Sequence, residues 1–237
     1  MAKSSINIQP VKSGSERHNT RKQELDYVNK DLSHLNYSET KIDISTQRKF
    51  YEHLAKEKTG RCMQKKATPI REAVFLFEEK HTNDDLYRLS RNLCDKFKLD
   101  FLQLHVHRDE GHREKHTGGW IPNYHAHLVV GWMDKNTGKS LKLNRDDMSK
   151  MQDFVAEQLK MERGAKGSKT TRLDAYDYKI AEKEKQIQKL VTQEESFKIL
   201  FDLAANNPTV KGELQKAIKK AAIKPKIRQP HHPPKRR

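Results

Sequence analysis

Two short stretches of this 237-residue chain concentrate side chains that bind metals. The first, HVHRDEGH, covers residues 105–112 and holds three histidines, an aspartate and a glutamate; the second, NYHAHLVV, covers residues 123–130 and holds two more histidines. Imidazole nitrogens and carboxylate oxygens are ligands of divalent first-row metals. A lone histidine on a half-exposed strand is usually only a hydrogen-bonded polar residue, so the chemistry depends on whether the fold brings the two stretches together.

Alternation of polar and apolar residues predicts that both stretches are β-strands, FLQLHVHRDE from residue 101 and YHAHLVVGWMD from residue 124. Side chains of a strand alternate between the two faces of a sheet. One face would carry Gln103, His105, His107, His125 and His127, and the other, facing the helices, would carry Leu102, Leu104, Val106, Ala126, Leu128 and Val130. In antiparallel neighbours, opposed Cβ atoms lie about 5 Å apart, so His107, His125 and His127 could bind one ion and leave positions open for substrate oxygens.

The remaining sequence predicts the elements that position these strands. In chain order we expect an edge strand at 4–11, a polar segment at 14–39, a helix at 46–66, a strand at 72–79, an amphipathic helix at 82–100, the two histidine-bearing strands, and a helix at 144–164 closed by Gly164. This order predicts an α+β fold, in which an antiparallel sheet in a split βαβ arrangement has helices packed on one face.

The composition changes after this region. We expect a main domain at 1–180, a charged helical C-terminal extension at 181–223, and a basic proline-rich tail at 224–237 without a fixed conformation. The charge pattern of the extension is compatible with contacts to a partner and equally with a solvated face.

Charge and composition narrow the class of protein. The formal net charge is +16, the isoelectric point about 9.7 and the mean hydropathy −1.02, which favour an acidic partner, most commonly nucleic acid. Cys62 and Cys94 form no CxxC pair, which argues against a cysteine zinc site or a disulfide scaffold. No apolar run is long enough to span a membrane and the N-terminus lacks the apolar core of a signal peptide, so we expect a cytoplasmic protein without membrane insertion.

Three motifs resemble those of one enzyme family. His107-x-Asp109-Glu110 followed by His125-x-His127 resembles the third motif of the Mob/Pre (MOBV-type) mobilization relaxases, a branch of the HUH endonucleases. HNTR, residues 18–21, is similar to the first motif of that family, and SHLNYSE, residues 33–39, is similar to the second. The motifs occur in the family's order, and the resemblance covers about residues 6–180.

The resemblance implies a relaxase-like fold and a bacterial DNA relaxase. Such an enzyme nicks one strand at a transfer origin by metal-dependent transesterification and stays attached to the 5′ end during conjugative mobilization of a plasmid or mobile element. The implied cofactor is Mn²⁺ or Mg²⁺, and imidazole ligands also suit Zn²⁺, Co²⁺ or Ni²⁺. The implied partners are single-stranded origin DNA, mobilization accessory proteins and a type IV coupling protein.

The resemblance also assigns roles near the N-terminus. His18 is the first choice of nucleophile, which would give a phosphoramidate, and Tyr37 is the second. A histidine nucleophile needs a carboxylate to orient or deprotonate it, and Glu110 is the first candidate, with Asp109 as the alternative.

Further residues of the motifs are candidates for contacts with DNA. Arg21 is expected to clamp a phosphate, and Asn19 to orient His18 or a backbone phosphate. Asn36 is a further DNA-binding candidate. The alternative for all three is ordinary loop capping or a solvated position.

One departure from the family pattern lies between Glu110 and His125. The family has only about three residues there, whereas this chain has fourteen, at 111–124. Gly118, Gly119 and Pro122 supply turn residues, so we expect a hairpin extension. Trp120, like Tyr124, could stack on a DNA base or pin the extension to the domain, and His112 and His116 are expected to be solvated.

Two other classes remain open. An HUH-type replication initiator or transposase would share the paired histidines but use a tyrosine on a C-terminal helix, for which Tyr176 and Tyr178 are available. A non-catalytic nucleic-acid-binding protein would use the histidines structurally or to bind zinc. Strand cleavage separates the enzymes from the binder.

Overall fold

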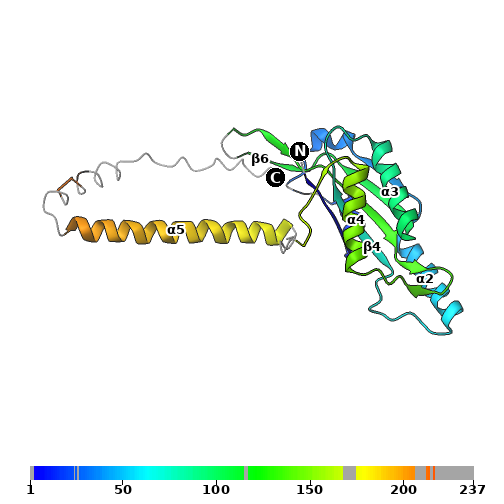
Figure 1. Ribbon diagram of the computed structural model, residues 1–237. Helices are drawn as coiled ribbons and strands as arrows, with labels where there is room; N and C mark the ends of the chain where they lie inside the picture. Colours follow the sequence, from blue (N-terminus) through cyan, green and yellow to red (C-terminus); the bar gives the residue numbers. More distant parts are fainter. Residues whose placement is uncertain are drawn as a thin grey trace, which may run out of the picture. The chain divides into compact units, whose positions relative to one another are not determined.

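The computed structural model describes residues 3–23, 25, 27–114, 117–167, 175–205, 212–213 and 216, with the side chains of 175–179, 200 and 203–205 left out. The chain divides into two compact units, Met1–Ser168 and Lys169–Arg237. The first contains a sheet with shorter helices, and the second contains the long helix α5, Ala175–Ala205 (Figure 1).

A five-stranded antiparallel sheet forms the centre of the first unit, with the order β2-β4-β8-β5-β3 among the described residues. The strands are β2 (Ile6–Pro10), β3 (Tyr37–Thr40), β4 (Ile70–Leu76), β5 (Asp100–His107) and β8 (His125–Gly131). Helix α3 (Asn83–Phe97) connects β4 to β5, which lie on the two sides of β8. This is the split βαβ arrangement, so the predicted α+β class is confirmed, and β2 is an edge strand as expected.

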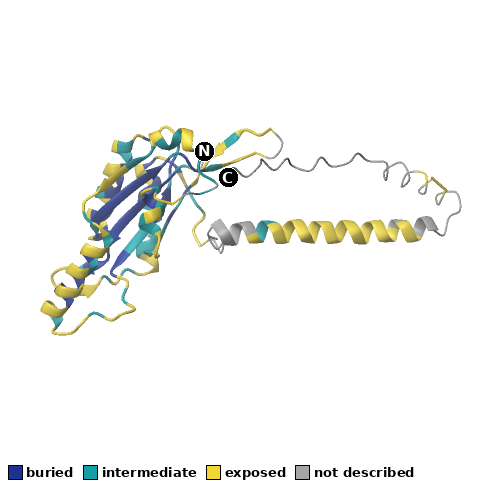
Figure 2. Ribbon diagram, turned by 180° about the vertical axis from the view of Figure 1, so that it is seen from behind, coloured by how far each residue is buried: buried dark blue, intermediate teal, exposed yellow. Residues whose placement is uncertain are grey.

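Helices α3 and α4 (Arg145–Gln158) cover one face of the sheet, whose strands are buried in Figure 2. Thr82 caps α3 in a capping box with Asp85, and Leu86, Leu89 and Leu93 are buried against the sheet. The core on this face includes Leu104, Val106, Ala126, Leu128 and Val130, the residues whose alternation predicted it.

Helix α2 (Ile44–Thr59) packs against the opposite face through Tyr51, Leu54 and Ala55. The expectation that Leu102 shares the helix-covered face of Leu104 and Val106 is wrong, because a β-bulge between Phe101 and Gln103 shifts the alternation. Leu102 therefore packs with α2. Because α2 occupies only one end of this face, the histidine-bearing end is left for helix α1 (Ser15–Asn19).

Two other segments differ from the expectations. The polar segment at 14–39 contains α1, the 3-10 helix η1 (Lys30–Leu35) and β3, and the sequence did not predict this strand. Helix α4 ends at Gln158, so the prediction that Gly164 closes it is wrong. The chain turns at Lys160, which adopts a left-handed conformation with φ of 49° that a sequence pattern does not expect of lysine.

Among the described residues of the first unit, six further short strands form three two-stranded pairs. They are β1 (Lys3–Ser4) with β11 (Glu162–Arg163), β6 (Gly111–Arg113) with β7 (Trp120–Pro122), and β9 (Met133–Asp134) with β10 (Lys139–Ser140). The β6–β7 pair is the hairpin that the insertion was expected to form.

In the second unit, α5 runs through residue 180, so the expected boundary between 180 and 181 falls within a helix. The expected domain boundaries stay predictions, and the tail at 224–237 lies outside the described residues. Among the described helices, none combines the length and the apolar character needed to cross a membrane.

Candidate metal centre and active site

Pairing of β5 with β8 brings three buried imidazoles together. In the antiparallel register His107 lies opposite His125, and His105 lies opposite His127. The ring centroids of His107, His125 and His127 are 4.9–5.2 Å apart. The geometry expected from the two alternating strands is therefore present.

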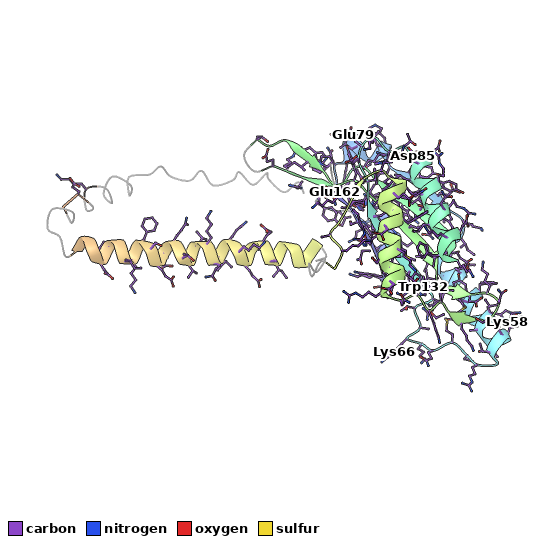
Figure 3. The ribbon with its side chains drawn as sticks, viewed as in Figure 1. Lys58, Lys66, Glu79, Asp85, Trp132 and Glu162 are labelled. Carbon is purple, nitrogen blue, oxygen red and sulfur yellow. The ribbon has the colours of Figure 1, made fainter. Side chains whose placement is uncertain are left out.

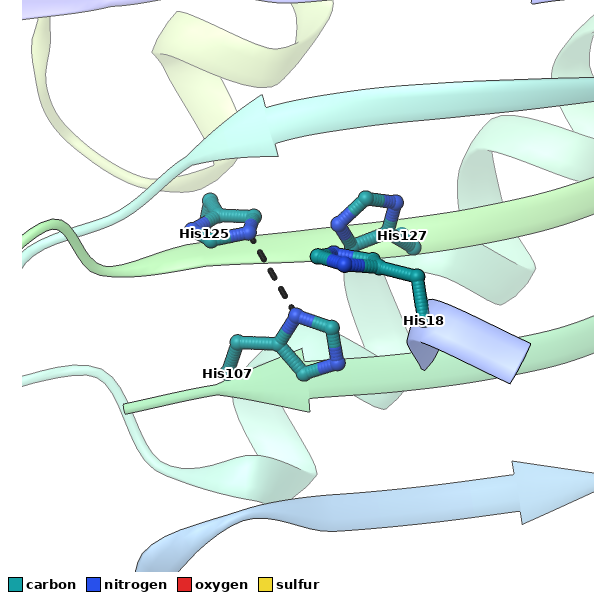
Figure 4. A group of neighbouring side chains, drawn as sticks. All are labelled: His18, His107, His125 and His127. Atoms are coloured by element: carbon teal, nitrogen blue, oxygen red, sulfur yellow. Dashed lines mark hydrogen bonds between the residues drawn. The ribbon is translucent and has the colours of Figure 1, made fainter. Parts of the chain in front are cut away.

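Helix α1 adds a fourth imidazole, that of His18, to this cluster (Figure 4). Its ring centroid is 5.3 Å from that of His107 and 5.1 Å from that of His127. One nitrogen from each of the four rings lies within 4.8 Å of the others. The His18 side chain is 21 % exposed, whereas that of His107 is only 2 % exposed. His18 is thus the member of the cluster that an incoming molecule can reach.

The outer nitrogens of the three strand histidines face hydrogen-bond acceptors. His107 Nε2 lies 3.2 Å from the Asn19 carbonyl oxygen, and His125 Nδ1 lies 2.8 Å from the Asn123 carbonyl oxygen. His127 Nδ1 lies 3.1 Å from Glu72 Oε1. A carbonyl oxygen or a carboxylate can only accept, so each of these outer nitrogens carries a proton, and in the neutral ring the inner nitrogen then carries the lone pair.

The inner nitrogens converge without donors of their own. His107 Nδ1 and His125 Nε2 are 3.4 Å apart, and His127 Nε2 is buried without a hydrogen-bond partner among the described residues. Lone pairs that face each other repel unless a cation or a proton lies between them. The donor set of three imidazoles, each held by an outer acceptor, suits a divalent transition-metal ion.

Burial favours the neutral form of three of these imidazoles, those of His18, His107 and His125. Desolvation lowers the pKa of His18 to about 4 and that of His125 to about 3, although the nearby Glu110 carboxylate raises both in part. Desolvation also lowers the pKa of His107. These rings therefore present lone pairs at neutral pH, as metal ligands and nucleophiles require.

Glu110 lies beside both His18 and the strand histidines. Its Oε1 is 3.3 Å from His18 Nε2 and 3.3 Å from His107 Nδ1, and its Oε2 is 3.6 Å from His125 Nε2. Burial alone would raise the pKa of this carboxyl, but its contacts with His107, His125 and His18 and with the cationic Arg21 guanidinium hold it well below its usual range. Glu110 is therefore an ionised carboxylate within reach of His18.

The insertion leaves Glu110 in place because both ends of the hairpin are tied at its base. The Asn123 N–H donates to the Glu110 carbonyl oxygen at 2.8 Å, and the Gly111 N–H donates to the Tyr27 carbonyl oxygen at 3.1 Å. The extra residues thus project from the domain as β6 and β7 without displacing the carboxylate. A side chain at Gly111 would collide with Trp120, so that indole packs on the base of the hairpin.

Glu72 on β4 connects the cluster to α1, and the motifs did not point to it. Its Oε1 accepts from Asn19 Nδ2 at 2.6 Å and faces His127 Nδ1, and its Oε2 accepts from Ser15 Oγ at 3.0 Å. Burial would raise the pKa of Glu72, but these hydrogen bonds, His127 first, lower it to about 2. Alternation on β4 was the available signal, because Ala73 and Phe75 face the core and leave Glu72 on the histidine face.

Asp109 has a different set of partners from Glu110. It is fully buried and accepts hydrogen bonds from Arg21, from Ser33 Oγ at 2.8 Å and from Asn36 Nδ2 at 2.7 Å. Arg21 also donates to Glu110 Oε1 at 2.8 Å, so its guanidinium joins the two carboxylates. Of the two carboxylates weighed for His18, only Glu110 contacts it among the described residues.

Tyr37 lies on the other face of the sheet from the histidines. It pairs with Val106, a core residue, and its ring packs against the core under α3 and α4. Desolvation and then Glu39, whose carboxylate accepts from the hydroxyl at 3.3 Å, raise the pKa of Tyr37. The structure therefore brings His18 to the cluster and leaves Tyr37 outside it.

His105 lies one pleat behind the cluster with both ring nitrogens engaged. Nδ1 is 3.0 Å from Ser38 Oγ and Nε2 is 3.1 Å from Gln103 Oε1. It supports β5 and has no nitrogen left for the central position.

The other candidates are at the periphery. Tyr124 stacks on Phe77 with centroids 5.8 Å apart, and His112 is exposed on β6. His116 and the side chains of Tyr176 and Tyr178 lie outside the described residues.

Similarity to solved structures is found at the level of the fold. Neither a protein-family model nor a curated protein sequence matches this chain. A structure described as the MobM relaxase domain (MOBV; Mob_Pre), Mn-bound with plasmid oriT DNA of 22 nucleotides, is similar over 76 % of this chain and 100 % of that chain, with 19 % identity and a TM-score of 0.59. The chain has a relaxase-domain fold. Another structure of the same domain with 26 nucleotides of oriT DNA covers 75 % of this chain and 99 % of that chain, at 15 % identity and a TM-score of 0.51.

The relaxase-domain fold accounts for about three quarters of the chain, and the compared structures are matched over nearly their whole length. The histidine cluster lies within the first unit.

Proposed function

We propose that this chain is a DNA relaxase that cuts one strand at a transfer origin by metal-dependent transesterification and becomes attached to the 5′ end. The observation that carries the proposal is the convergence of three lone-pair nitrogens beside a reachable His18 and an ionised Glu110. The relaxase-domain fold, bound to oriT DNA and Mn in the similar structures, supports DNA as the substrate.

His107, His125 and His127 would hold the ion, with Mn²⁺ or Mg²⁺ as the first choices. When bound, it would supply positive charge beside the scissile phosphate and so stabilise the negative charge that develops on the phosphate oxygens. The outer acceptors Glu72, Asn19 and Asn123 hold the three rings in the tautomers that this role requires.

His18 is the nucleophile of the proposed reaction. Its Nε2–H is donated to Glu110, which leaves the lone pair on Nδ1 for attack on phosphorus. A P–N bond forms, the bond from phosphorus to the 3′ oxygen breaks, and the 5′ phosphate remains on the imidazole as a phosphoramidate. The Nε2 proton passes to Glu110 and from there to the leaving 3′ oxygen, which becomes a free 3′ hydroxyl.

Arg21 and Asn19 position these groups. Arg21 bridges Asp109 and Glu110, and so holds the carboxylate that faces His18. Asn19 links α1 to Glu72 and fixes the helix that carries His18. With an 18 % exposed side chain, Arg21 can also meet a phosphate oxygen at the edge of the cluster.

The direct test is cleavage of a supercoiled plasmid that carries the element's own transfer origin, with Mn²⁺ or Mg²⁺ present. In this assay we expect a nicked circle with protein on its 5′ end. In the cell, the same reaction would take place in the bacterial cytoplasm. No covalent adduct with either metal would refute the relaxase assignment and leave a DNA-binding protein.

A further inference from the structure

A second feature of the first unit, which we call the cationic hollow, has a volume of about 1080 Å³ and lies between α2 and the β9–β10 hairpin. The last turn of α2, the connection at 60–69 and the hairpin form its walls. Its cations are Lys58, Arg61, Lys66 and Lys139, and none of the described residues that line it is acidic. The chain has 32 acidic residues, yet none of those described places a carboxylate on this wall.

Two walls of the hollow are fixed by close packing. Gly138 has a φ of +64°, and a Cβ there would lie 2.8 Å from Lys58 Cβ and 3.0 Å from the Leu54 carbonyl oxygen, so the hairpin sits directly on α2. Gly60, with a φ of +69°, ends α2 and donates its N–H to the Lys56 carbonyl oxygen at 2.9 Å. The cations are therefore brought together by the fold.

The positive charges are poorly compensated. Within the described residues Arg61, Lys66 and Lys139 form no ion pair, and Lys58 Nζ lies 3.1 Å from the neighbouring Glu57 Oε1. The hydroxyl of Thr68 also lines the hollow and can donate to an anion. Clustered cations with neutral donors between them are the groups that contact phosphates in nucleic-acid complexes.

The hollow lies at the opposite end of the strands from the histidines. Met133 lines it and follows His125 by eight positions along β8 and β9, a span of roughly 26 Å at the usual strand rise. Lys58 and Lys66 are at one end of the unit and Glu79, beyond β4, is at the other (Figure 3). Helix α2, which forms one wall, packs on the face of the sheet that bears the histidines.

We infer that the cationic hollow binds the DNA backbone at a second point, about eight nucleotides from the phosphate at the histidine cluster if the strand keeps the ~3.4 Å spacing of a duplex. The inference rests on the proposed function for the identity of the polyanion. It adds an anchor that holds the substrate without taking part in the cleavage reaction.

Cys62 provides a native reporter, because it is an exposed free thiol that lines the hollow, while Cys94 is buried. The rate of alkylation of Cys62 by N-ethylmaleimide is measured by mass spectrometry with a single strand of about 30 nucleotides, with the matching duplex, and without DNA. We expect at least one DNA to slow the reaction about fivefold or more, and high salt to restore it. Equal rates with and without both DNAs would overturn the inference.

A charge-matched pair of variants gives an independent readout. The hollow variant carries Lys58→Gln, Arg61→Gln, Lys66→Gln and Lys139→Gln. The control variant carries Lys3→Gln, Lys80→Gln, Arg88→Gln and Lys150→Gln, which are exposed and lie elsewhere in the unit. Both variants lose four positive charges, so a difference in their DNA affinity depends on where the charges lie and not on the net charge.

Affinity for the fluorescein-labelled form of the DNA that protects Cys62 is measured by anisotropy over a range of salt concentrations. The hollow variant should bind about tenfold more weakly than the control variant and show a shallower salt dependence. Binding of both variants to vesicles containing phosphatidylserine is measured in parallel. Equal DNA affinities of the two variants, or a loss of affinity by the hollow variant for the vesicles alone, would overturn the assignment to DNA. Neither readout requires cleavage, so a protein that protects Cys62 with DNA but forms no adduct would refute the relaxase function alone.

Discussion

His107 Nδ1 and His125 Nε2 face each other at 3.4 Å, although the other nitrogen of each ring lies against a backbone carbonyl oxygen. Two lone pairs in this arrangement leave a position that a cation stabilises. With His127 Nε2 buried and unpartnered beside them, the cluster has the donors for one divalent ion.

The first prediction concerns this donor set. His125→Ala or His127→Ala should lower metal-dependent nicking at least about 100-fold, because a ligand is lost. Binding of single-stranded DNA should keep most of its salt dependence, about −0.7 per neutralised phosphate. Nicking assays and anisotropy measure the two effects, with His112→Ala as a control on an exposed histidine. Unchanged metal dependence in either variant would show that the ion binds elsewhere.

The second prediction concerns Glu72, which faces His127 Nδ1 at 3.1 Å. Glu72→Ala should weaken Mn²⁺ binding by about 10–100-fold, because the His127 ring loses the carboxylate that fixes its tautomer and orientation. Isothermal titration calorimetry measures this affinity, and Glu72→Gln should lose less because its amide oxygen can still accept from the ring.

Glu52→Gln, on the exposed surface of α2, is the matched control for the loss of a carboxylate. A Glu72→Ala protein that binds Mn²⁺ as tightly as this control would contradict the role given to Glu72. Thermal unfolding of the metal-free variants separates an effect on the ligand from a loss of fold.

The β5–β8 part of the site could be predicted from sequence because it depends on a short-range pattern. Alternation on two strands gave the face of His107, His125 and His127, and their antiparallel pairing followed from the fold class. Alternation on β4 could have placed Glu72 on the histidine face, but not its role, because its contacts join β4 to α1 across 53 positions in sequence, between Asn19 and Glu72. Leu102 was misplaced because a β-bulge depends on how two strands meet, which composition does not report.

The third prediction is a pH dependence of stability in the metal-free protein. The pKa of His18 and of His105 is lowered to about 4, and that of His125 to about 3, in each case first by desolvation. These rings resist protonation when folded but accept a proton near pH 6.5 when unfolded, so protons bind preferentially to the unfolded chain. Stability should be full above about pH 6.5 and fall as the pH drops toward about 4.

Thermal unfolding between pH 7.5 and pH 4 measures this dependence. His105→Gln should reduce the dependence of the melting temperature on pH, because one ring that titrates on unfolding is lost. This substitution removes no proposed metal ligand. A melting temperature that rises as the pH falls through this window would contradict the assignment of neutral buried histidines.

The fourth prediction separates the two candidate nucleophiles. His18→Ala should abolish the covalent adduct, because no other imidazole of the cluster combines exposure with contact to Glu110. Tyr37→Phe should keep adduct formation within about twofold of the unaltered protein, since the ring packs on the opposite face of the sheet. Denaturing gels with labelled oligonucleotide compare the two variants. An adduct formed by His18→Ala would show that another residue is the nucleophile.

The most direct measurement is mass spectrometry of the protein trapped on a cleaved origin oligonucleotide, with acid-free handling to preserve a P–N bond. If His18 is the nucleophile, a peptide containing His18 carries the 5′ phosphate, and the same spectrum gives the position of the cut. A 5′ phosphate on Tyr37, or on any residue other than His18, would contradict the assignment of His18 as the nucleophile.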